Sequence, residues 1–369
     1  MKMRTRARRR ITVGAASSRL GVLQETPLQI QAMKIAAAQI ACTPGDLEAN
    51  LLTIKDFASR AKDAGAELIV FPEMIDTGYS MPVIQKHATS WTEGADPQLQ
   101  KMAKQFSLAI IAGVSDREGP RSYNGQVFID AGGNIRAKYR KTHLVTAAPL
   151  DERPVFAAGD TFVSCKLDKF NLGLTICYDL RFPEVCRALA VEHSANVFVN
   201  SSAWPLPRLD HLRILALARA IENQCYLVLA NRVGTDDGVT FCGTSAIIDP
   251  YGVIVAAAAA DREELIQAEI SEEIINSSAW PFPRLEHLRI LALARAIENQ
   301  CYLILANRVG TDDGVTFCGT SAIIDPYGVI VAAASADREE LIQAEISEEV
   351  IKSVRRRMAV FDHRRQDLY

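Results

Sequence analysis

Apolar and polar positions change their spacing in regular blocks along the chain from Met33 onward. The run "MKIAAAQIAC", which starts there, is almost continuously apolar and predicts a buried strand. In "GDLEANLLTIKDFASRAKDAG" (45–65) apolar residues recur at helical spacing, with Asp46 near the expected start and Gly65 at the expected end. "AELIVFPE" (66–73) predicts a second strand.

The middle of the chain carries more strand patterns, which then come in pairs. "LAIIAGV" (108–114), "NGQVFID" (124–130) and "NIRAKYRK" (134–141) predict strands, with Gly and Asn expected at the turns. "FNLGLTIC" (170–177) predicts another strand, and "RFPEVCRALAVEH" (181–193) predicts a helix. Alternating helices and strands favour an α/β layered fold over an all-α or all-β one.

A long internal repeat interrupts this order. Residues 200–275 recur as residues 276–351, both beginning "NSSAWP". The differences are conservative: Leu206/Phe282, Asp210/Glu286, Val228/Ile304, Ala259/Ser335 and Ile274/Val350. Repeat architectures usually need three or more units with divergent ends, so this pattern indicates a recent tandem duplication or an error in gene assembly. A single layered α/β domain can accommodate only one copy of the repeat in its sheets.

Residues 1–32 form a basic leader that we expect to be disordered. "MKMRTRARRRITVGAASSRLGVLQ" is rich in Arg and has no acidic residue before Glu25. It is interpreted as a basic tail, as an extension upstream of a protein that starts at Met33, or as an organellar transit peptide. We therefore expect a cytoplasmic protein, or a mitochondrial or plastid one if the leader is a targeting peptide.

Composition excludes several classes of protein. The formal net charge is −3, with 49% hydrophobic and 23% charged residues, so neither a nucleic-acid partner nor a membrane span is expected. The eight cysteines include no CxxC pair, and the six histidines include no HExxH motif. We therefore expect no disulfide framework and no metal site.

Three positions carry residue types that suit nucleophilic catalysis. Cys177 ends a strand and precedes a predicted helix, whose dipole is expected to lower the pKa of the thiol. Glu73 follows an apolar strand, where burial is expected to raise the pKa of a general base. Lys141 could hold a developing oxyanion. Taken singly, each residue has an ordinary alternative role. Cys177 would be a buried structural thiol, Glu73 a surface acid in a turn, and Lys141 part of a solvated basic run.

Together these positions resemble the nitrilase superfamily of carbon–nitrogen hydrolases. The resemblance rests on "FPEM", "YRKTHL" and "GLTICYDLRFPE", and is reinforced by "NSSAW", "ARAIENQCYLVLANRVG", "GTSAIIDPYG" and "VFDHRRQDLY". It runs from about residue 34 to the C-terminus, interrupted by the extra repeat. The strings "CYDLRFPE" and "HRRQDLY" are most similar to the Nit-type amidases, the ω-amidase and deaminated-glutathione amidase branch.

The resemblance implies a four-layer αββα sandwich, assembly into a homodimer or a higher homo-oligomer, and a Glu-Lys-Cys triad that uses neither a metal nor an organic cofactor. Glu73 would be the general base, Cys177 the nucleophile and Lys141 the stabiliser of the tetrahedral intermediate. Glu152, in "DERPVFAAGD", matches the second glutamate of many members, and its alternative is an exposed loop acid.

Further residues are expected to bind the substrate. The backbone N–H of Tyr178 would donate to the oxyanion. Arg181, expected in the first turn of the helix, would pair with a substrate carboxylate, or else form a salt bridge with Glu184. Trp204, or its twin Trp280, would wall the pocket, or else belong to the core or an interface.

The predicted function is hydrolysis of the amide of a small carboxylic acid through a cysteine thioester, with release of ammonia. The alternatives are a nitrilase acting on nitriles, a catalytically inactive interaction protein disrupted by the duplication, and a weaker thiol-redox role for Cys177. The predicted hydrolase domain comprises residues 33–275 and the C-terminal segment 350–369. Residues 276–349 would be surplus: partly ordered, packed outside, or swapped into a neighbour.

Overall fold

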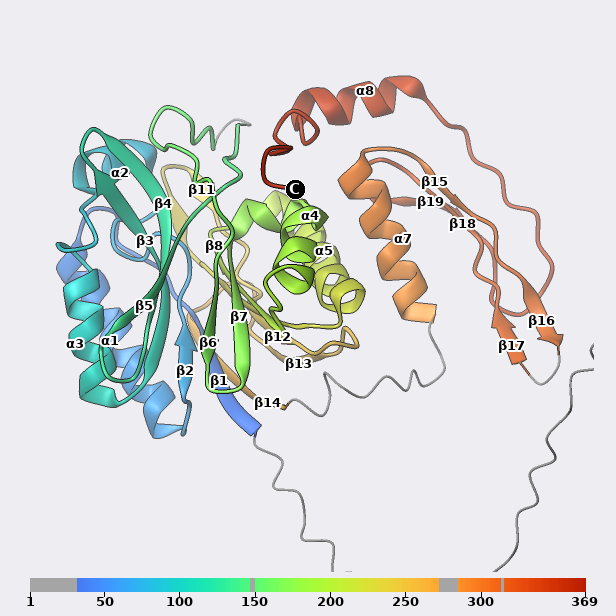
Figure 1. Cartoon of the computed structure of the whole chain (residues 1–369). Helices are drawn as coiled ribbons and strands as arrows, with labels where there is room; N and C mark the ends of the chain where they lie inside the picture. Colours follow the sequence, from blue (N-terminus) through green and yellow to red (C-terminus); the bar gives the residue numbers. More distant parts are fainter. Residues whose placement is uncertain (1–31, 147–149, 272–284, 313–314) are drawn as a thin grey trace, which may run out of the picture. The chain divides into compact units, whose positions relative to one another are not determined.

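The computed structural model describes residues 32–146, 150–271, 285–312 and 315–369. Residues 1–31 of the leader and Trp280 lie outside the described residues, and the last leader residue, Ala32, already belongs to the first strand. Two six-stranded sheets form the centre of the molecule (Figure 1). No helix in the described ranges is both long and apolar enough to cross a membrane.

The first sheet has the strand order β14-β1-β2-β3-β4-β5. Its strands are β1 (Ala32–Gln39), β2 (Leu68–Val70), β3 (Ala109–Glu118), β4 (Arg121–Ile129), β5 (Ile135–Arg140) and β14 (Glu264–Ser271). The predicted strands in this half of the chain are thereby confirmed. The strand predicted from Asn124 begins earlier, at Arg121, so Asn124 lies inside β4 opposite Ser115.

The second sheet has the order β13-β12-β9-β8-β7-β6. Its strands are β6 (Ser164–Leu167), β7 (Phe170–Ile176), β8 (Val197–Ser202), β9 (Tyr226–Asn231), β12 (Ala246–Ile248) and β13 (Ile254–Ala257). The central strands β7, β8 and β9 run parallel. They are buried along almost their whole length, as expected for strands covered on both faces.

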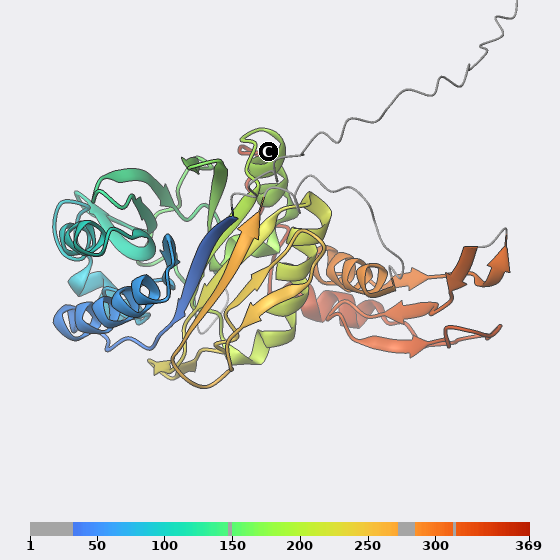
Figure 2. The ribbon, with the colours of Figure 1, turned by 90° about the horizontal axis from the view of Figure 1, so that it is seen from below.

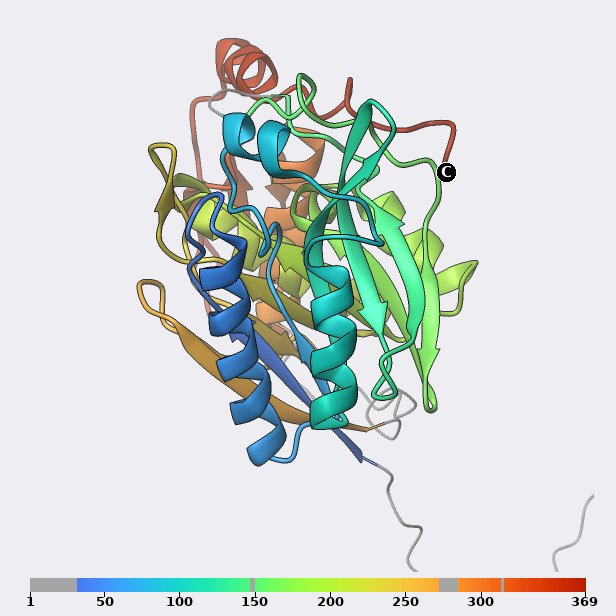
Figure 3. The same ribbon diagram turned by 90° about the vertical axis from the view of Figure 1, so that its left-hand side faces the viewer.

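Helices cover the outer face of each sheet (Figures 1 and 3). On the first sheet lie α1 (Leu47–Asp63) and α3 (Asp96–Phe106), which bury Phe57 and Leu99 in a shared apolar cluster. On the second sheet lie α4 (Pro183–Val191) and α5 (Leu209–Asn223). This arrangement is the αββα sandwich that the sequence resemblance predicted.

The ends of α1 follow from its local sequence. The Asp46 side chain accepts a hydrogen bond of 3.0 Å from the backbone N–H of Ala49 and so caps the first turn. Gly65, with φ +82°, takes the chain out of the helix in a conformation that favours glycine. The shorter connecting elements are α2 (Met81–His87), β10 (Thr235–Asp236), β11 (Val239–Thr240), and the 3₁₀ helices η1 (Cys177–Arg181) and η2 (Leu206–Arg208).

The second copy of the repeat forms the same local elements as the first. They are α7 (Leu285–Asn299), β15 (Leu303–Leu305), β16 (Val309–Asp312), β17 (Val315–Cys318), β18 (Ala322–Ile324) and β19 (Ile330–Ala333). The register of β18 against β19 repeats that of β12 against β13, including the irregularity beside Ile324 and its counterpart Ile248.

The two copies differ in their last strand. In the first copy β14 pairs with β1 over its whole length. Its counterpart in the second copy, residues 340–347, has no strand structure. The chain then forms α8 (Glu348–Arg357), and the segment after it returns to the sandwich, where His363 lies against Tyr178 (Figure 2).

Candidate active site

Cys177 stands at the turn that joins β7 to η1. Its φ of +42° lies in the left-handed region, which is uncommon for a residue with a side chain. The Asp179 carboxylate supports the turn by accepting bonds from the Ile176 N–H (2.9 Å) and the Tyr139 hydroxyl (2.8 Å). The helix α4 begins only at Pro183, so the expectation that Cys177 directly precedes a helix is wrong, and the same holds for Arg181 in the helix's first turn.

The Cys177 thiol is buried, and this reverses its expected pKa shift. Burial is the main reason why the pKa of Cys177 lies well above its ordinary value, and the negative charge of Glu73 adds to it. The charge of Lys141 acts in the opposite direction but does not outweigh them. The sulfur is therefore a neutral thiol near pH 7 and needs a base in order to attack.

Glu73 follows β2 and is fully buried, so the alternative of a surface acid is wrong. Its backbone lies against β3, where a Cβ on Gly113 would come within 2.6 Å of the Glu73 Cα; only glycine leaves that space. Burial raises the pKa of Glu73, as predicted, although the nearby Lys141 lowers it. The carboxylate accepts bonds from Asn124 Nδ2 (2.6 Å) and from the backbone N–H of Ala203 (2.7 Å).

Lys141 follows β5 and is also fully buried, so the alternative of a solvated basic face is wrong. Its Nζ lies 3.0 Å from Glu73 Oε1 and 2.9 Å from Glu152 Oε1. Burial alone would lower the pKa of Lys141, but the charges of Glu152 and Glu73 outweigh it, and the pKa lies well above its ordinary value. Lys141 is therefore a permanent cation between two carboxyl groups.

Glu152 is a buried part of the same cluster and not an exposed loop acid. Its Oε1 also accepts from the Tyr79 hydroxyl (2.6 Å) and Asn124 Nδ2 (3.1 Å). Its Oε2 accepts from the backbone N–H of Val145 (2.7 Å). With every oxygen bonded, Glu152 holds the Lys141 ammonium in place.

Sequence reasoning missed Asn124 and Tyr79, which complete the cluster. Asn124 bridges Glu73 and Glu152, and Tyr79 donates to Glu152. The only sequence signal for Asn124 is a polar residue at the start of a predicted strand. Tyr79 follows a glycine in "DTGYS" and carried no signal of its own.

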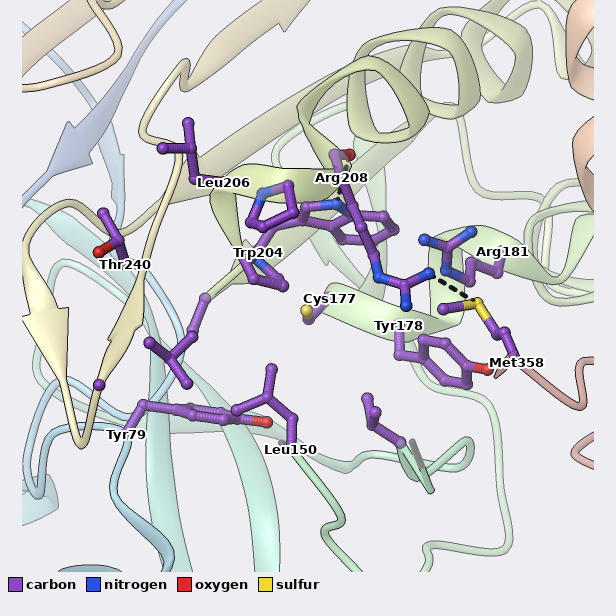
Figure 4. A pocket seen from close by; sticks show the side chains of 16 residues that line it. Tyr79, Leu150, Cys177, Tyr178, Arg181, Trp204, Leu206, Arg208, Thr240 and Met358 are labelled. Carbon is purple, nitrogen blue, oxygen red and sulfur yellow. Dashed lines mark hydrogen bonds between the residues drawn. The ribbon is translucent and has the colours of Figure 1, made fainter. Parts of the chain in front are cut away.

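A cavity of about 410 Å³ opens beside Cys177 (Figure 4). Tyr178, Arg181 and Trp204 line it, in agreement with their predicted place. The Trp204 ring lies under the Arg181 guanidinium, 4.8 Å from its carbon, and its indole N–H donates to the carbonyl of Arg208. Arg208 and Met358, which sequence reasoning did not select, also line the cavity.

The cavity contains positive charge without a matching carboxylate. Nε and one terminal nitrogen of Arg181 have no hydrogen-bond partner, and burial lowers the pKa of this residue to about 10. Arg208 donates only to the Met358 sulfur, at 3.6 Å. Among the described residues no carboxylate pairs with either guanidinium; the alternative pair of Arg181 with Glu184 is wrong, because Glu184 pairs with Arg364.

The arrangement suits attack of a thiol on a carbonyl carbon. A neutral thiol is placed in the field of a buried carboxyl with a raised pKa and of a fixed ammonium. Within the described ranges no three His, Cys, Asp or Glu side chains are grouped so as to hold a metal ion.

Comparison with known proteins points in the same direction. The family model described as "Carbon-nitrogen hydrolase" matches residues 34–279 and again residues 271–356. A 2-oxoglutaramate amidase of Bacillus subtilis (strain 168) is 38% identical over 217 residues, 58% of this chain and 82% of that protein. A deaminated glutathione amidase of Synechocystis sp. (strain PCC 6803 / GT-S) is 32% identical over 265 residues, 68% of this chain and 96% of that protein.

Solved structures of an amidase from Nesterenkonia sp. have a similar fold. One has a TM-score of 0.61 at 28% identity and covers 70% of this chain and 95% of that chain. Another, of the amidase from strain AN1, has a TM-score of 0.61 at 27% identity, with 70% and 95% of the two chains covered. It shows the acetamide moiety of fluoroacetamide covalently added at the active-site cysteine of that protein.

Proposed function

Because the chain belongs to the carbon–nitrogen hydrolase family, we propose that Cys177, Glu73 and Lys141 hydrolyse the amide of a small carboxylic acid through a thioester. The chain is a hydrolase that acts on amides, as its relatives are. The observation that carries the residue assignment is the burial of one thiol, one ammonium and two carboxyls in a single cluster beside the cavity.

The proposed reaction has two halves. Glu73 takes the thiol proton while Cys177 attacks the amide carbonyl, and the oxyanion accepts bonds from Lys141 and the backbone N–H of Tyr178. Glu73 returns the proton to the amide nitrogen, so the carbon–nitrogen bond breaks and ammonia leaves an acyl thioester. Water, deprotonated by the same carboxylate, then attacks the thioester, and the acid and the free thiol are formed. Glu152 positions Lys141 throughout.

The substrate we propose carries a free carboxylate besides the amide, as the ω-amide of a dicarboxylic acid does. Arg181 and Arg208 supply two guanidiniums to the cavity that holds Cys177, and neither is paired with an acid of the described chain. A substrate carboxylate would compensate this charge in bidentate fashion, and Trp204 would hold the Arg181 plane. The name of the Bacillus relative, 2-oxoglutaramate amidase, describes an ω-amide of this kind.

Arg208→Gln tests the substrate class. Loss of a charge-assisted hydrogen bond, worth about 1.5–3 kcal/mol, should raise KM for an ω-amide by about 10- to 100-fold. The kcat/KM for a neutral amide such as butyramide should change little. Steady-state ammonia release measures both, with Arg213→Gln as control because Arg213 is exposed on helix α5, which directly follows Arg208. An equal loss for both substrates would refute the carboxylate-binding role.

The decrease of activity at low pH, its acid limb, should reflect protonation of Glu73. The base works only when ionised, and burial raises its pKa, so log kcat/KM should fall with unit slope as pH decreases through a midpoint above 4.5. Lys141 stays protonated well beyond pH 10.5, so it should contribute no alkaline limb below that pH. Glu73→Gln should reduce kcat/KM by about 10²- to 10⁴-fold and remove this limb. An acid limb that persists in Glu73→Gln would assign it to another group.

The remaining assignments are also proposals. We propose residues 33–275 and 350–369 as the hydrolase domain, and residues 1–32 as a leader outside it. The pairing of β14 with β1 supports the first of these, because it uses the first copy. We propose a cytoplasmic protein, or an organellar one if the leader is a transit peptide. Imaging of fluorescent fusions with and without residues 1–32 tests this choice.

A further inference from the structure

The two copies of the repeat contact each other through the same residues. Helix α5 of the first copy packs against α7 of the second (Figure 1). Arg219 bonds Glu298 at 2.9 Å, and Arg295 bonds Glu222 at 2.6 Å. Each residue of the second pair is the counterpart of one in the first, displaced by the repeat length of 76 residues.

A second pair of contacts has the same reciprocity. His211 Nε2 lies 3.0 Å from the carbonyl oxygen of Tyr327, and His287 Nε2 lies 2.5 Å from that of Tyr251. His287 and Tyr327 are the counterparts of His211 and Tyr251. When residue i of one copy meets j of the other, and j meets i, the contact is isologous, as in a two-fold symmetric dimer. The copies are therefore related by an approximate two-fold axis inside one chain.

The charged side chains at this axis pair only with one another among the ion pairs of the described residues. Arg219 also bonds Glu222 at 2.6 Å, and Arg295 also bonds Glu298, so each carboxylate meets both arginines. The side chains of Arg219, Glu222 and Glu298 are 0%, 6% and 3% exposed. The pair Arg219 and Glu222 is self-complementary. Two copies of this pair, related by a two-fold axis, would form the same four ion pairs.

The docked second copy also holds the C-terminal segment 358–369 at the cavity. Gln300 Nε2, at the end of α7, donates to the Met358 carbonyl at 2.6 Å. Met358 lines the cavity and its sulfur accepts from Arg208. Further along, His363 Nδ1 lies 2.9 Å from the Tyr178 hydroxyl (Figure 4 shows Tyr178 and Met358 at the cavity).

We propose that the second copy is a tethered substitute for a partner subunit: it occupies the self-complementary face of α5 within one chain and thereby carries residues 358–369 into the wall of the substrate cavity. Without it, the α5 face would bind the same face of another chain. The homo-oligomer expected from the family resemblance is, at this face, replaced by an intramolecular contact.

Arg295→Glu in the full chain tests this proposal. It places a third carboxylate beside Glu222 and Glu298 and expels α7, whereas the α5 face, with Arg219 and Glu222 intact, remains able to pair with itself. Light scattering during size-exclusion chromatography should show twice as many chains per particle as in the wild type. Hydrogen–deuterium exchange of residues 358–369 should increase by more than tenfold, and kcat/KM should fall. Arg338→Glu is the control, because it makes the same charge change at a side chain that is 71% exposed.

A second variant covers the case in which Arg295→Glu does not fold. Deletion of residues 276–351 joins Ile275 to Lys352 and leaves one copy, and its particle should again hold twice as many chains as the wild type. An unchanged number of chains in both variants, or unchanged exchange of residues 358–369 in Arg295→Glu, would overturn the proposal. These readouts do not depend on turnover, so an inactive wild type would refute the proposed function alone.

Discussion

Cys177→Ala is expected to reduce ammonia release from an ω-amide by about 10⁴-fold or more, because removal of a nucleophile removes the covalent pathway and leaves only binding and polarisation. The buried thiol makes this variant informative. Alanine conserves most of the volume, and Glu73 and Lys141 keep their bonds to Asn124 and Glu152. The measurement is initial-rate ammonia release from equal concentrations of folded protein.

The matched control is Cys165→Ala, because Cys165 lies on the outer strand β6, away from the cavity. It should retain wild-type activity. Fluoroacetamide, which adds at the active-site cysteine of the Nesterenkonia amidase, should label the wild type at Cys177 and leave Cys177→Ala unlabelled there in peptide mass spectra. Equal ammonia release from wild type and Cys177→Ala would end the nucleophile assignment.

Lys141→Met is expected to cost both activity and stability. Its ammonium is the shared partner of Glu73 and Glu152, and all three side chains are fully buried. Removing one partner of a buried ion pair costs about 3–5 kcal/mol of unfolding free energy, because it leaves buried charge uncompensated. The kcat should fall by at least about 10²-fold from loss of oxyanion stabilisation alone. Urea unfolding at pH 7 measures the first effect, and ammonia release the second.

The pH dependence of the Lys141→Met defect has a definite sign. Burial raises the pKa of Glu73, and Lys141 is the main group that opposes this shift. Without the cation, the folded state therefore binds a proton at Glu73 more readily than the unfolded chain does, so the lost stability should partly return as pH falls from 7 towards 5. Lys138→Met is the control, because Lys138 is exposed on β5, the strand that directly precedes Lys141; this substitution should cost less than about 1 kcal/mol. A defect in Lys141→Met no larger than in Lys138→Met would contradict the buried-cluster description.

Local sequence was sufficient for most of the secondary structure. The apolar run of β1 and the helical spacing of α1 with its Asp46 cap appear in the structure where the pattern predicted them. These features depend on neighbours a few residues away, so a pattern read along the chain contains them. The motifs around Glu73, Lys141 and Cys177 also sufficed to select the candidate triad by resemblance.

Local sequence could not tell how each charged side chain is surrounded. Lys141 sits in a run of bases that is typical of a solvated surface, and Glu152 in a loop, yet both are fully buried. Asn124 stands at the start of a predicted strand, and nothing in the local pattern indicates that its side chain bridges two carboxyls. The partners of these three side chains lie from 7 to 73 positions away along the chain.

The sequence by itself determined the layered fold and the family and selected the candidate reacting groups, because these follow from short-range patterns and from motifs. Only the tertiary structure decided the protonation of Cys177, the pairing of Lys141 with two acids, and the unpaired guanidiniums of Arg181 and Arg208. It alone decided that the copies meet through reciprocal contacts. The physical reason is that desolvation and charge interactions depend on distances in space, and segments far apart in the chain set those distances.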